Sequence, residues 1–346
     1  TDVISSSVAL SSTATTGPAI SAGLSTALNS ALSLTQSGTN DGTIDWDFTV
    51  ANNLTQYIAV GETVTATYTI TVTDDSAAGN STATQDVTIA ITGTNDAPTI
   101  TVVDVAGSVT EDASTPNLVD SGSVTFTEVD ATDVISASVA LSSTATTGPA
   151  IPVGLTTALN SALSLVQTGT NDGSVTWNFA VANNLTQYLT NGETVTATYT
   201  IAVTDDSGTG TDTATQDVTI VITGTNDAPD ISGGPGTSSL TESNIGLTDS
   251  GTLTVSDVDT TDAVSAAVDS VTVTGTGAGS VPGSLTNATL RGFLTVAPTA
   301  ILNGTQNSAT LNWTFNSSTE AFNFLSTGDT LVLTYTVSAA DDDAAP

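Results

Sequence analysis

The chain has 346 residues, enough for two or three domains that each bury a core of their own. It holds 35 acidic residues, one Lys or Arg and no His, and the resulting net charge of −34 excludes nucleic acid and anionic lipid as partners. It has no Cys, hence no disulfide or thiolate chemistry, and no apolar run long enough for membrane insertion.

In chain order, the dominant feature is a long internal repeat. Residues 1–98 recur at 132–229 with about four positions in five identical, and a divergent third copy begins near 261. The sequence therefore predicts three repeats: an N-terminally truncated first repeat at 1–96, a complete second repeat at 97–227, and a divergent, C-terminally truncated third repeat at 228–346.

Within a repeat, short segments alternate apolar and polar residues with the period of a β-strand. Such segments are 121–130 and 175–181, and the runs 193–206 and 213–224 are joined by a Gly-containing loop suited to a hairpin. The segments ALNSALSL (27–34, 158–165) are interpreted as irregular strands rather than short helices. The pattern predicts an all-β fold of tandem Ig-like β-sandwich domains.

Large aromatic side chains recur at matching places on the predicted strands. Because the chain is only 4% aromatic, we expect these residues to fill the cores of the sandwiches rather than to form a sugar-binding patch. They are Trp46, Trp177, Trp313, Tyr68, Tyr199 and Tyr335.

Acidic residues recur at the predicted boundaries between repeats. The hexapeptide GTNDAP stands at 93–98 and 224–229, and an acidic cluster follows each copy by about thirty residues. Carboxylate and amide oxygens at the end of a strand are the ligands that Ca²⁺ prefers, so we expect calcium sites there. The candidates are Asn95, Asp96, Glu128, Asp130 and Asp133 at one boundary and Asn226, Asp227, Asp257, Asp259 and Asp262 at the next.

Two further sets of acidic residues are weaker candidates for the same ions. Glu111 and Glu242 each follow a Thr near the start of a repeat, and a double-Asp turn follows a strand in every copy. Asp and Asn are also common in turns for purely local reasons, because their side chains bond to nearby backbone. The double-Asp turns are Asp74 and Asp75, Asp205 and Asp206, and Asp341 and Asp342.

The stretch WNFAVANNLTQYLTNGETVTATYTIAVTDDSGTGTDTATQDVTIVITGTNDAP at 177–229 resembles the VCBS repeat of giant bacterial surface proteins, as does SGTLTVSDVDTTD at 250–262. The resemblance covers essentially the whole chain. It implies tandem Ig-like or cadherin-like domains in an elongated array, within the extender of an RTX-type adhesin that Ca²⁺ stiffens. The RTX nonapeptide repeat itself is absent.

Without His, Cys or Lys, the chain lacks the usual general bases and nucleophiles, so we expect no enzyme. The resemblance implies a secreted, cell-surface extender that binds calcium ions, contacts neighbouring repeats of the same chain, and projects an adhesive tip for cell adhesion or biofilm formation. One alternative is a carbohydrate- or surface-binding module, with the divergent stretch 264–312 as its ligand site. The other is a filament subunit that self-associates by strand complementation.

Overall fold

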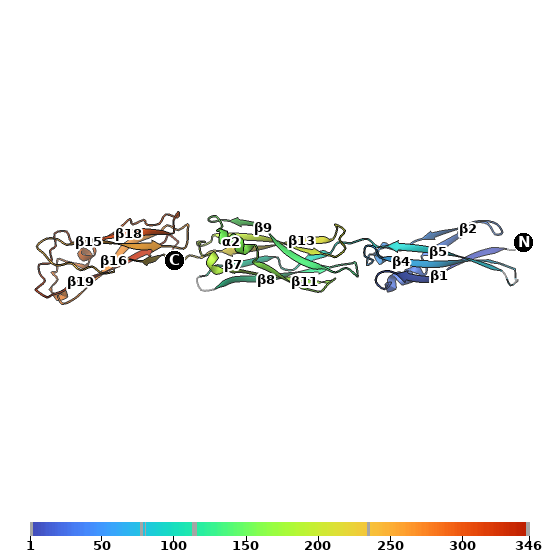
Figure 1. The fold of residues 1–346 in the computed structure, drawn as a ribbon, viewed down its shortest axis with the longest axis horizontal. Coiled ribbons are helices and arrows are strands. Elements are labelled where there is room, and N and C mark those ends of the chain that lie inside the picture. Colours follow the sequence, from blue (N-terminus) through green and yellow to red (C-terminus); the bar gives the residue numbers. More distant parts are fainter. Residues whose placement is uncertain (1–2, 77–78, 80, 113–115, 234–235, 344–346) are drawn as a thin grey trace.

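The computed structural model describes residues 3–76, 79, 81–112, 116–233 and 236–343. Three β-rich units lie end to end along one axis (Figure 1). The all-β class predicted from the alternating segments is confirmed. Among the described residues, no helix has the length and apolar character needed to cross a membrane.

The middle unit is a sandwich of two four-stranded sheets, with strand orders β10-β11-β8-β6 and β7-β13-β12-β9. All pairings are antiparallel except that of β7 with β13. Lettered A, A′, B to G in chain order, the strands form the sheets DEBA and A′GFC, which is an Ig-like order. The elements are β6 (Thr99–Val102), β7 (Ala106–Thr110), β8 (Asn117–Thr127), β9 (Ser136–Thr146), α2 (Val153–Leu159), β10 (Leu163–Thr168), β11 (Gly173–Ala182), η2 (Asn183–Leu185), β12 (Thr194–Thr204) and β13 (Thr213–Thr223).

The first unit contains the counterparts of strands C to G in the sheets β1-β4-β5 and β2-β3. Its residues repeat those of the middle unit, so the same strands form with the same antiparallel pairings. The elements are β1 (Ile4–Thr15), α1 (Ala22–Leu28), β2 (Leu32–Gln36), β3 (Ile44–Phe48), η1 (Asn52–Leu54), β4 (Thr63–Asp74) and β5 (Thr82–Thr92).

The third unit contains the counterparts of strand A and of strands B to F in the sheets β14-β15-β18-β17 and β16-β19, and no counterpart of A′ among the described residues. The domain bounds expected from the repeats remain a prediction. The elements are β14 (Asp230–Ser232), β15 (Thr248–Ser256), β16 (Ser265–Thr274), η3 (Ala278–Ser280), α3 (Asn287–Arg291), β17 (Leu294–Ala297), β18 (Ser308–Asn316) and β19 (Val332–Ala340).

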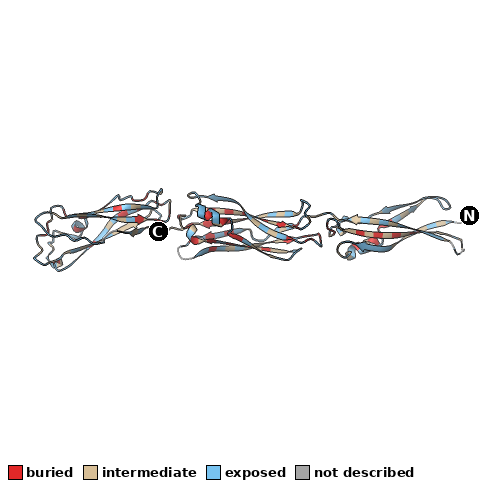
Figure 2. Ribbon diagram, viewed as in Figure 1, coloured by how far each residue is buried: buried red, intermediate tan, exposed pale blue. Residues whose placement is uncertain are grey.

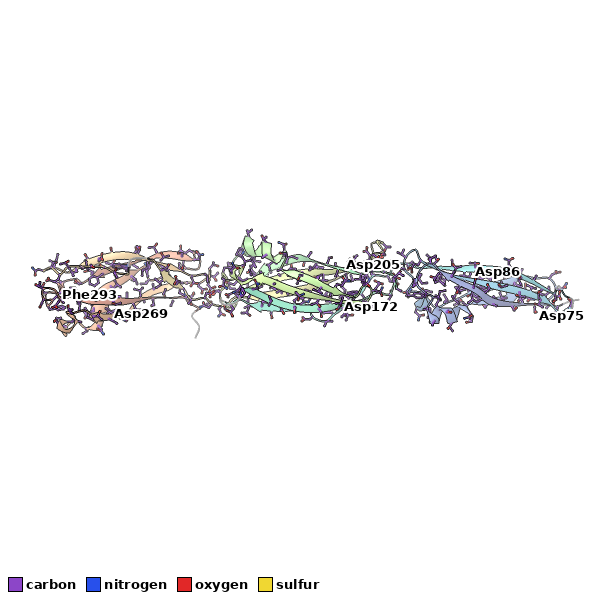
Figure 3. The ribbon with its side chains drawn as sticks, turned by 60° about the horizontal axis from the view of Figure 1, so that its bottom comes forward. Asp75, Asp86, Asp172, Asp205, Asp269 and Phe293 are labelled. Carbon is purple, nitrogen blue, oxygen red and sulfur yellow. The ribbon has the colours of Figure 1, made fainter. Side chains whose placement is uncertain are left out.

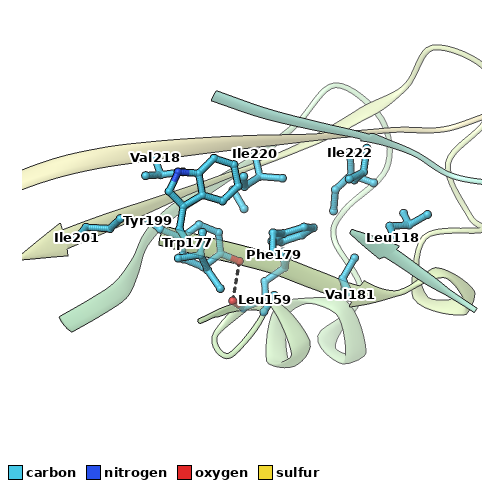
Figure 4. Close-up of a cluster of buried hydrophobic side chains, with 14 of the residues drawn as sticks. Leu118, Leu159, Trp177, Phe179, Val181, Tyr199, Ile201, Val218, Ile220 and Ile222 are labelled. Atoms are coloured by element: carbon cyan, nitrogen blue, oxygen red, sulfur yellow. Dashed lines mark hydrogen bonds between the residues drawn. The ribbon is translucent and has the colours of Figure 1, made fainter. Parts of the chain in front are cut away.

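Buried side chains form separate clusters in the three units, and the largest lies between the two sheets of the middle unit (Figures 2 and 4). On β12 the inward positions are all buried, while the Thr residues between them are partly exposed. This alternation follows from the period of two in a strand. Each unit therefore has a core of its own.

A tyrosine hydroxyl joins strand F to a short helix in every unit. Tyr199 donates to the carbonyl of Leu159 at 2.8 Å (Figure 4), and Tyr68 and Tyr335 make the equivalent bonds at 2.8 Å. The accepting carbonyls lie at helix ends, where they have no partner within the helix. Tyr68 and Tyr199 are buried, as predicted, and Tyr335 is partly buried.

The three tryptophans differ in burial, and the prediction of a core role is wrong for Trp46. Trp177 is fully buried, and its Nε1 donates to the carbonyl of Asp104 at 2.8 Å. Trp46 is 45% exposed, because the first unit has no counterparts of β7 and β8 among the described residues to cover it. Trp313 is partly buried.

The interpretation of 27–34 and 158–165 as irregular strands is also wrong for their first residues. Helix α1 begins after Ser21, whose hydroxyl accepts from the amide of Leu24 at 3.2 Å. Its buried Leu24 and Leu28 are one turn apart, so one face of the helix covers the core. Within these two segments, the strands β2 and β10 begin only at Leu32 and Leu163.

Candidate metal centres at the two junctions

The candidate residues lie on loops that follow strand ends, and these loops meet where consecutive units touch. At the first junction, the linker between β5 and β6 meets the loops after β8 and β12. Figure 3 shows Asp172 and Asp205 at the end of the middle unit that faces the first. We define the first junction as Asn95, Asp96, Glu128, Asp130, Asp133 and Asp205, and the second junction as Asn226, Asp227, Asp257, Asp259, Asp262 and Asp341.

Hydrogen bonds attach the linker of the first junction to the middle unit. The amide of Asp96 donates to Oδ2 of Asp130 at 2.8 Å, and Nδ2 of Asn95 donates to Oδ2 of Asp205 at 3.2 Å. The amide of Asp130 donates to Oε1 of Glu128 at 3.0 Å. The structure thus brings together linker and cluster residues separated by more than thirty positions.

The second junction repeats this arrangement. The amide of Asp227 donates to Oδ2 of Asp259 at 2.7 Å, and Nδ2 of Asn226 donates to Oδ2 of Asp341 at 3.4 Å. The amide of Asp259 donates to Oδ1 of Asp257 at 3.1 Å. Two copies of one arrangement in a single chain indicate that the repeated sequence itself specifies it.

Most of these side chains are buried, and many have an oxygen with no partner. Asp130 and Asp259 are at most 1% exposed, although each carries a carboxylate. In the described part of the chain, every buried side-chain atom without a hydrogen-bond partner, the Tyr188 hydroxyl apart, belongs to a junction. Such atoms are costly unless something else satisfies them. They are Asn95 Oδ1, Glu128 Oε2, Asp130 Oδ1, Asp133 Oδ2, Asn226 Oδ1, Asp227 Oδ2, Asp257 Oδ2, Asp259 Oδ1, Asp262 Oδ2 and Asp341 Oδ1.

Burial and mutual repulsion raise the pKa values of the clustered carboxyls. Burial is the larger cause, and neighbouring carboxylates add to it. The pKa rises to about 6 for Asp130, Asp133 and Asp262 and to about 8 for Asp259. The pKa values of Glu128, Asp227 and Asp257 are also raised, with burial again the main cause.

At the second junction, the carboxylates approach closely enough to share one ion. One oxygen each of Asp257, Asp262 and Asp341 lies within 4.8 Å of the other two. The sole cationic side chain, Arg291, lies in α3 of the third unit and donates to the carbonyl of Asp269 at 3.2 Å. The junction carboxylates therefore have no cationic side chain of the chain as a partner among the described residues.

Glu111 lies at the second junction, although in sequence it follows the first linker. Strand β7 runs parallel to β13, so both strands end on the same side of the middle unit. Glu111 is fully buried there, and its Oε2 accepts from the amide and hydroxyl of Thr225 at 2.9 and 2.8 Å. Its other oxygen accepts from the side-chain amide Nε2 of Gln187. Glu111 lines a hollow with Thr225 and Asp227, and its charge contributes to the raised pKa of Asp227.

The remaining candidates lie apart from the carboxylate clusters or have local roles. Glu242 is exposed, and none of the hydrogen bonds described at either junction involves it. Asp75 lies at the far end of the first unit (Figure 3), where its Oδ1 accepts from the amide of Val3 at 2.7 Å. Asp74 accepts from the amide of Ser76 at 2.9 Å.

In the other double-Asp turns, the two members have different roles. The first members, Asp205 and Asp341, bond the linker. The second members hold the end of the acidic-cluster loop of the same unit: Asp206 accepts from the amide of Val134 at 2.9 Å, and Asp342 from the amide of Ala263 at 2.7 Å. The second members thus connect loops that lie 72 and 79 positions apart in the sequence, and their role is not the short-range one that is common for Asp in turns.

Two residues that the sequence did not single out, Asn171 and Asp172, bond the backbone of the acidic cluster at the first junction. Nδ2 of Asn171 donates to the carbonyl of Asp130 at 2.8 Å and to that of Asp133 at 3.2 Å. Oδ1 of Asp172 accepts from the amide of Glu128 at 3.0 Å. A signal was present, because GTND at 169–172 repeats the first four letters of the linker hexapeptide.

Comparisons with known proteins add little to this description. No family model matches the chain, and no curated protein matches it. Among solved structures, zebrafish RET cadherin-like domains 1 to 4 match 99% of this chain at 10% identity, with a TM-score of 0.23. A chimeric titin Z1Z2 tandem matches 70% of this chain and 96% of its own at 13% identity, with a TM-score of 0.19. The Streptococcus agalactiae BspA C-terminal domain matches 70% and 97%, at 12% identity and a TM-score of 0.15.

The chain spans 63% of the RET structure's length, and TM-scores of this size carry no argument about the shared fold. The class of protein follows instead from the strand order and the junctions. This is an all-β protein of tandem Ig-like sandwiches in an elongated array, with buried carboxylates gathered where consecutive units meet.

Proposed function

We propose that this chain is a structural extender segment whose junctions are made rigid by bound Ca²⁺. One observation supports the proposal above others: buried, partnerless oxygens gather at both junctions, with no cationic side chain beside them in the described part. Uncompensated buried carboxylates destabilise a fold, and a divalent cation would compensate them.

The residues present fit calcium better than other common metals. The donors are all oxygens of Asp, Glu and Asn, and the sequence contains neither His nor Cys. Calcium takes about six to eight oxygen ligands, and carboxylates and amide carbonyls are its usual protein donors. The ligands proposed are the partnerless oxygens of the two junctions, with Asp205 at the first and Glu111 at the second.

Such sites would stiffen the array because their ligands come from both sides of a flexible connection. At the second junction, Glu111 belongs to the middle unit, Asn226 and Asp227 to the linker, and Asp259 to the third unit. A cation held by all of them would resist bending of the linker. In this proposal the segment belongs to a secreted bacterial surface adhesin and projects an adhesive tip for cell adhesion and biofilm formation.

The experiment compares solution dimensions and thermal stability in millimolar calcium and in chelator. We expect calcium to raise the melting temperature of the chain. We also expect small-angle X-ray scattering to give a larger maximum dimension in calcium than in chelator. The double variant Asp130→Asn, Asp259→Asn should lose most of both responses. The matched control is Asp217→Asn, an exposed residue on β13 whose carboxylate accepts from Thr200. Equal scattering and equal melting with and without calcium would overturn the proposal.

A further inference from the structure

A second set of hydrogen bonds crosses each junction. None of these bonds uses the buried junction oxygens that have no hydrogen-bond partner. The carbonyl of Tyr57 accepts from the amide of Ala131 at 3.1 Å, and Oε1 of Glu62 accepts from the hydroxyl of Thr132 at 2.9 Å. Tyr57 and Glu62 precede β4 of the first unit, while Ala131 and Thr132 follow β8 of the middle unit. We call these four residues the first latch.

The second junction has the same contacts at the corresponding positions. The carbonyl of Tyr188 accepts from the amide of Thr260 at 3.4 Å, and Oε1 of Glu193 accepts from the hydroxyl of Thr261 at 3.0 Å. These four residues form the second latch. The third unit differs in sequence from the middle one, so the recurrence indicates that the contact is specified by the residues it uses.

The glutamate of each latch is held in place by its own unit. The second oxygen of Glu62 accepts from the amide of Ala59 at 3.0 Å, and that of Glu193 from the amide of Thr190 at 3.3 Å. A Cβ added at Gly17 would lie 2.3 Å from the Glu62 carboxylate, and one at Gly148 would lie 2.4 Å from that of Glu193. A side chain at either glycine would therefore force the neighbouring carboxylate to move from this position.

The latch and the carboxylate cluster share one short loop. Thr132 stands between Asp130 and Asp133, and the Glu62 charge contributes to the raised pKa of Asp133. A bend that separates Thr132 from Glu62 also moves both aspartates. The contact itself needs no metal, because a hydroxyl and an amide donate directly to oxygens of the preceding unit.

We propose that the latches are a metal-independent device that sets the resting orientation of consecutive units. Thr132 and Thr261 are its positioning residues, and Glu62 and Glu193 are their acceptors. In the metal-free chain, the latched orientation keeps the loop and its carboxylates in place. The inference concerns the metal-free state and does not depend on calcium binding.

The test uses pulsed electron paramagnetic resonance on the full chain in chelator. Because the sequence has no Cys, a nitroxide pair can be placed at the exposed residues Ser7 and Ser138 to report on the first junction. A second pair at Ser138 and Ala267, both exposed, reports on the second junction.

Thr132→Val removes the hydroxyl at nearly constant volume. We expect the ratio of latched to unlatched molecules at the first junction to fall by about ten-fold or more, as for loss of one hydrogen bond to a carboxylate. The second junction should keep its wild-type distance distribution, and Thr261→Val should give the converse result. Thr132→Ser retains the hydroxyl and should restore the narrow distribution.

Gly17→Ala is an independent variant, because it displaces Glu62 without altering the loop that contains the carboxylates. It should broaden the first-junction distribution as Thr132→Val does. The proposal is overturned if both variants match the wild type in chelator, or if Thr132→Ser is as broad as Thr132→Val. Asp130→Asn should leave the latch closed in chelator, which separates this result from the outcome for calcium.

Discussion

The amide of Asp96 donates to Oδ2 of Asp130 at 2.8 Å, which leaves Oδ1 of Asp130 buried without a partner. The same relationship joins Asp227 to Asp259 at 2.7 Å. One oxygen of each carboxylate thus holds the linker, and the other remains available inside the junction. This division predicts opposite effects of one substitution in two solutions.

Asp130→Asn should stabilise the protein in chelator and destabilise it in calcium. In chelator, Asn retains an oxygen for the amide of Asp96 while removing a buried charge, so we expect a gain on the order of 1 kcal/mol at pH 7.5. In calcium, the loss of a charged ligand should outweigh that gain. Thermal unfolding in both solutions measures the effect, with the exposed Asp86 (Figure 3) changed to Asn as control. A shift of the same sign in both solutions would contradict the prediction.

The metal-free protein should become less stable as the pH rises. The pKa values of Asp130, Asp133 and Asp262 are raised to about 6 and that of Asp259 to about 8, so the folded state binds more protons than the unfolded state. This contribution to stability is fully present below about pH 4 and is lost as the pH passes through the folded values. Denaturant unfolding in chelator from pH 5 to 8.5 should show the fall.

In saturating calcium the fall between pH 5 and 8.5 should be reduced or reversed, because protons and cations compete for the same oxygens. The pH series is therefore repeated with calcium in excess. A metal-free stability that is flat or rises across this range would show that the clustered carboxyls are charged at no cost.

Equivalent tryptophans should differ in their contribution to stability. Trp177→Ala should cost about 3–5 kcal/mol in the middle unit, because the indole is fully buried between the sheets (Figure 4). Trp46→Ala should cost well below that, because Trp46 is 45% exposed. Unfolding of each variant in denaturant, followed by far-UV circular dichroism, distinguishes the two, because each substitution removes the one tryptophan of its own unit. Equal losses would mean that Trp46 is covered in solution.

Glu111→Gln should weaken the second junction and spare the first. Both carboxylate oxygens of Glu111 accept hydrogen bonds, from Thr225 and from Gln187, and an amide group can replace only one of the oxygens. We expect a loss of about 1–3 kcal/mol in the unit that contains it, together with weaker calcium binding at the second junction. Calcium titration calorimetry of the two variants should show that Glu111→Gln loses binding at the second junction and that Asp130→Asn loses binding at the first. If both variants lose the same event, Glu111 does not act at the second junction.

The sequence by itself determined the all-β class, the repeat, and the pairing of an Asn-Asp linker with an acidic cluster. Those features depend on local alternation and on a fixed spacing that returns every repeat. Tyr199 was also predictable as a core residue, since large side chains are scarce in this chain.

Tertiary structure alone decided where Glu111 acts and which tryptophan is covered. Glu111 reaches the second junction because β7 pairs in parallel with β13, and strand pairing is not a local property of sequence. Trp46 and Trp177 occupy equivalent positions of the repeat but differ in burial, because burial depends on strands that are distant in sequence. The contact of Thr132 with Glu62 likewise exists only when two folded units meet end to end.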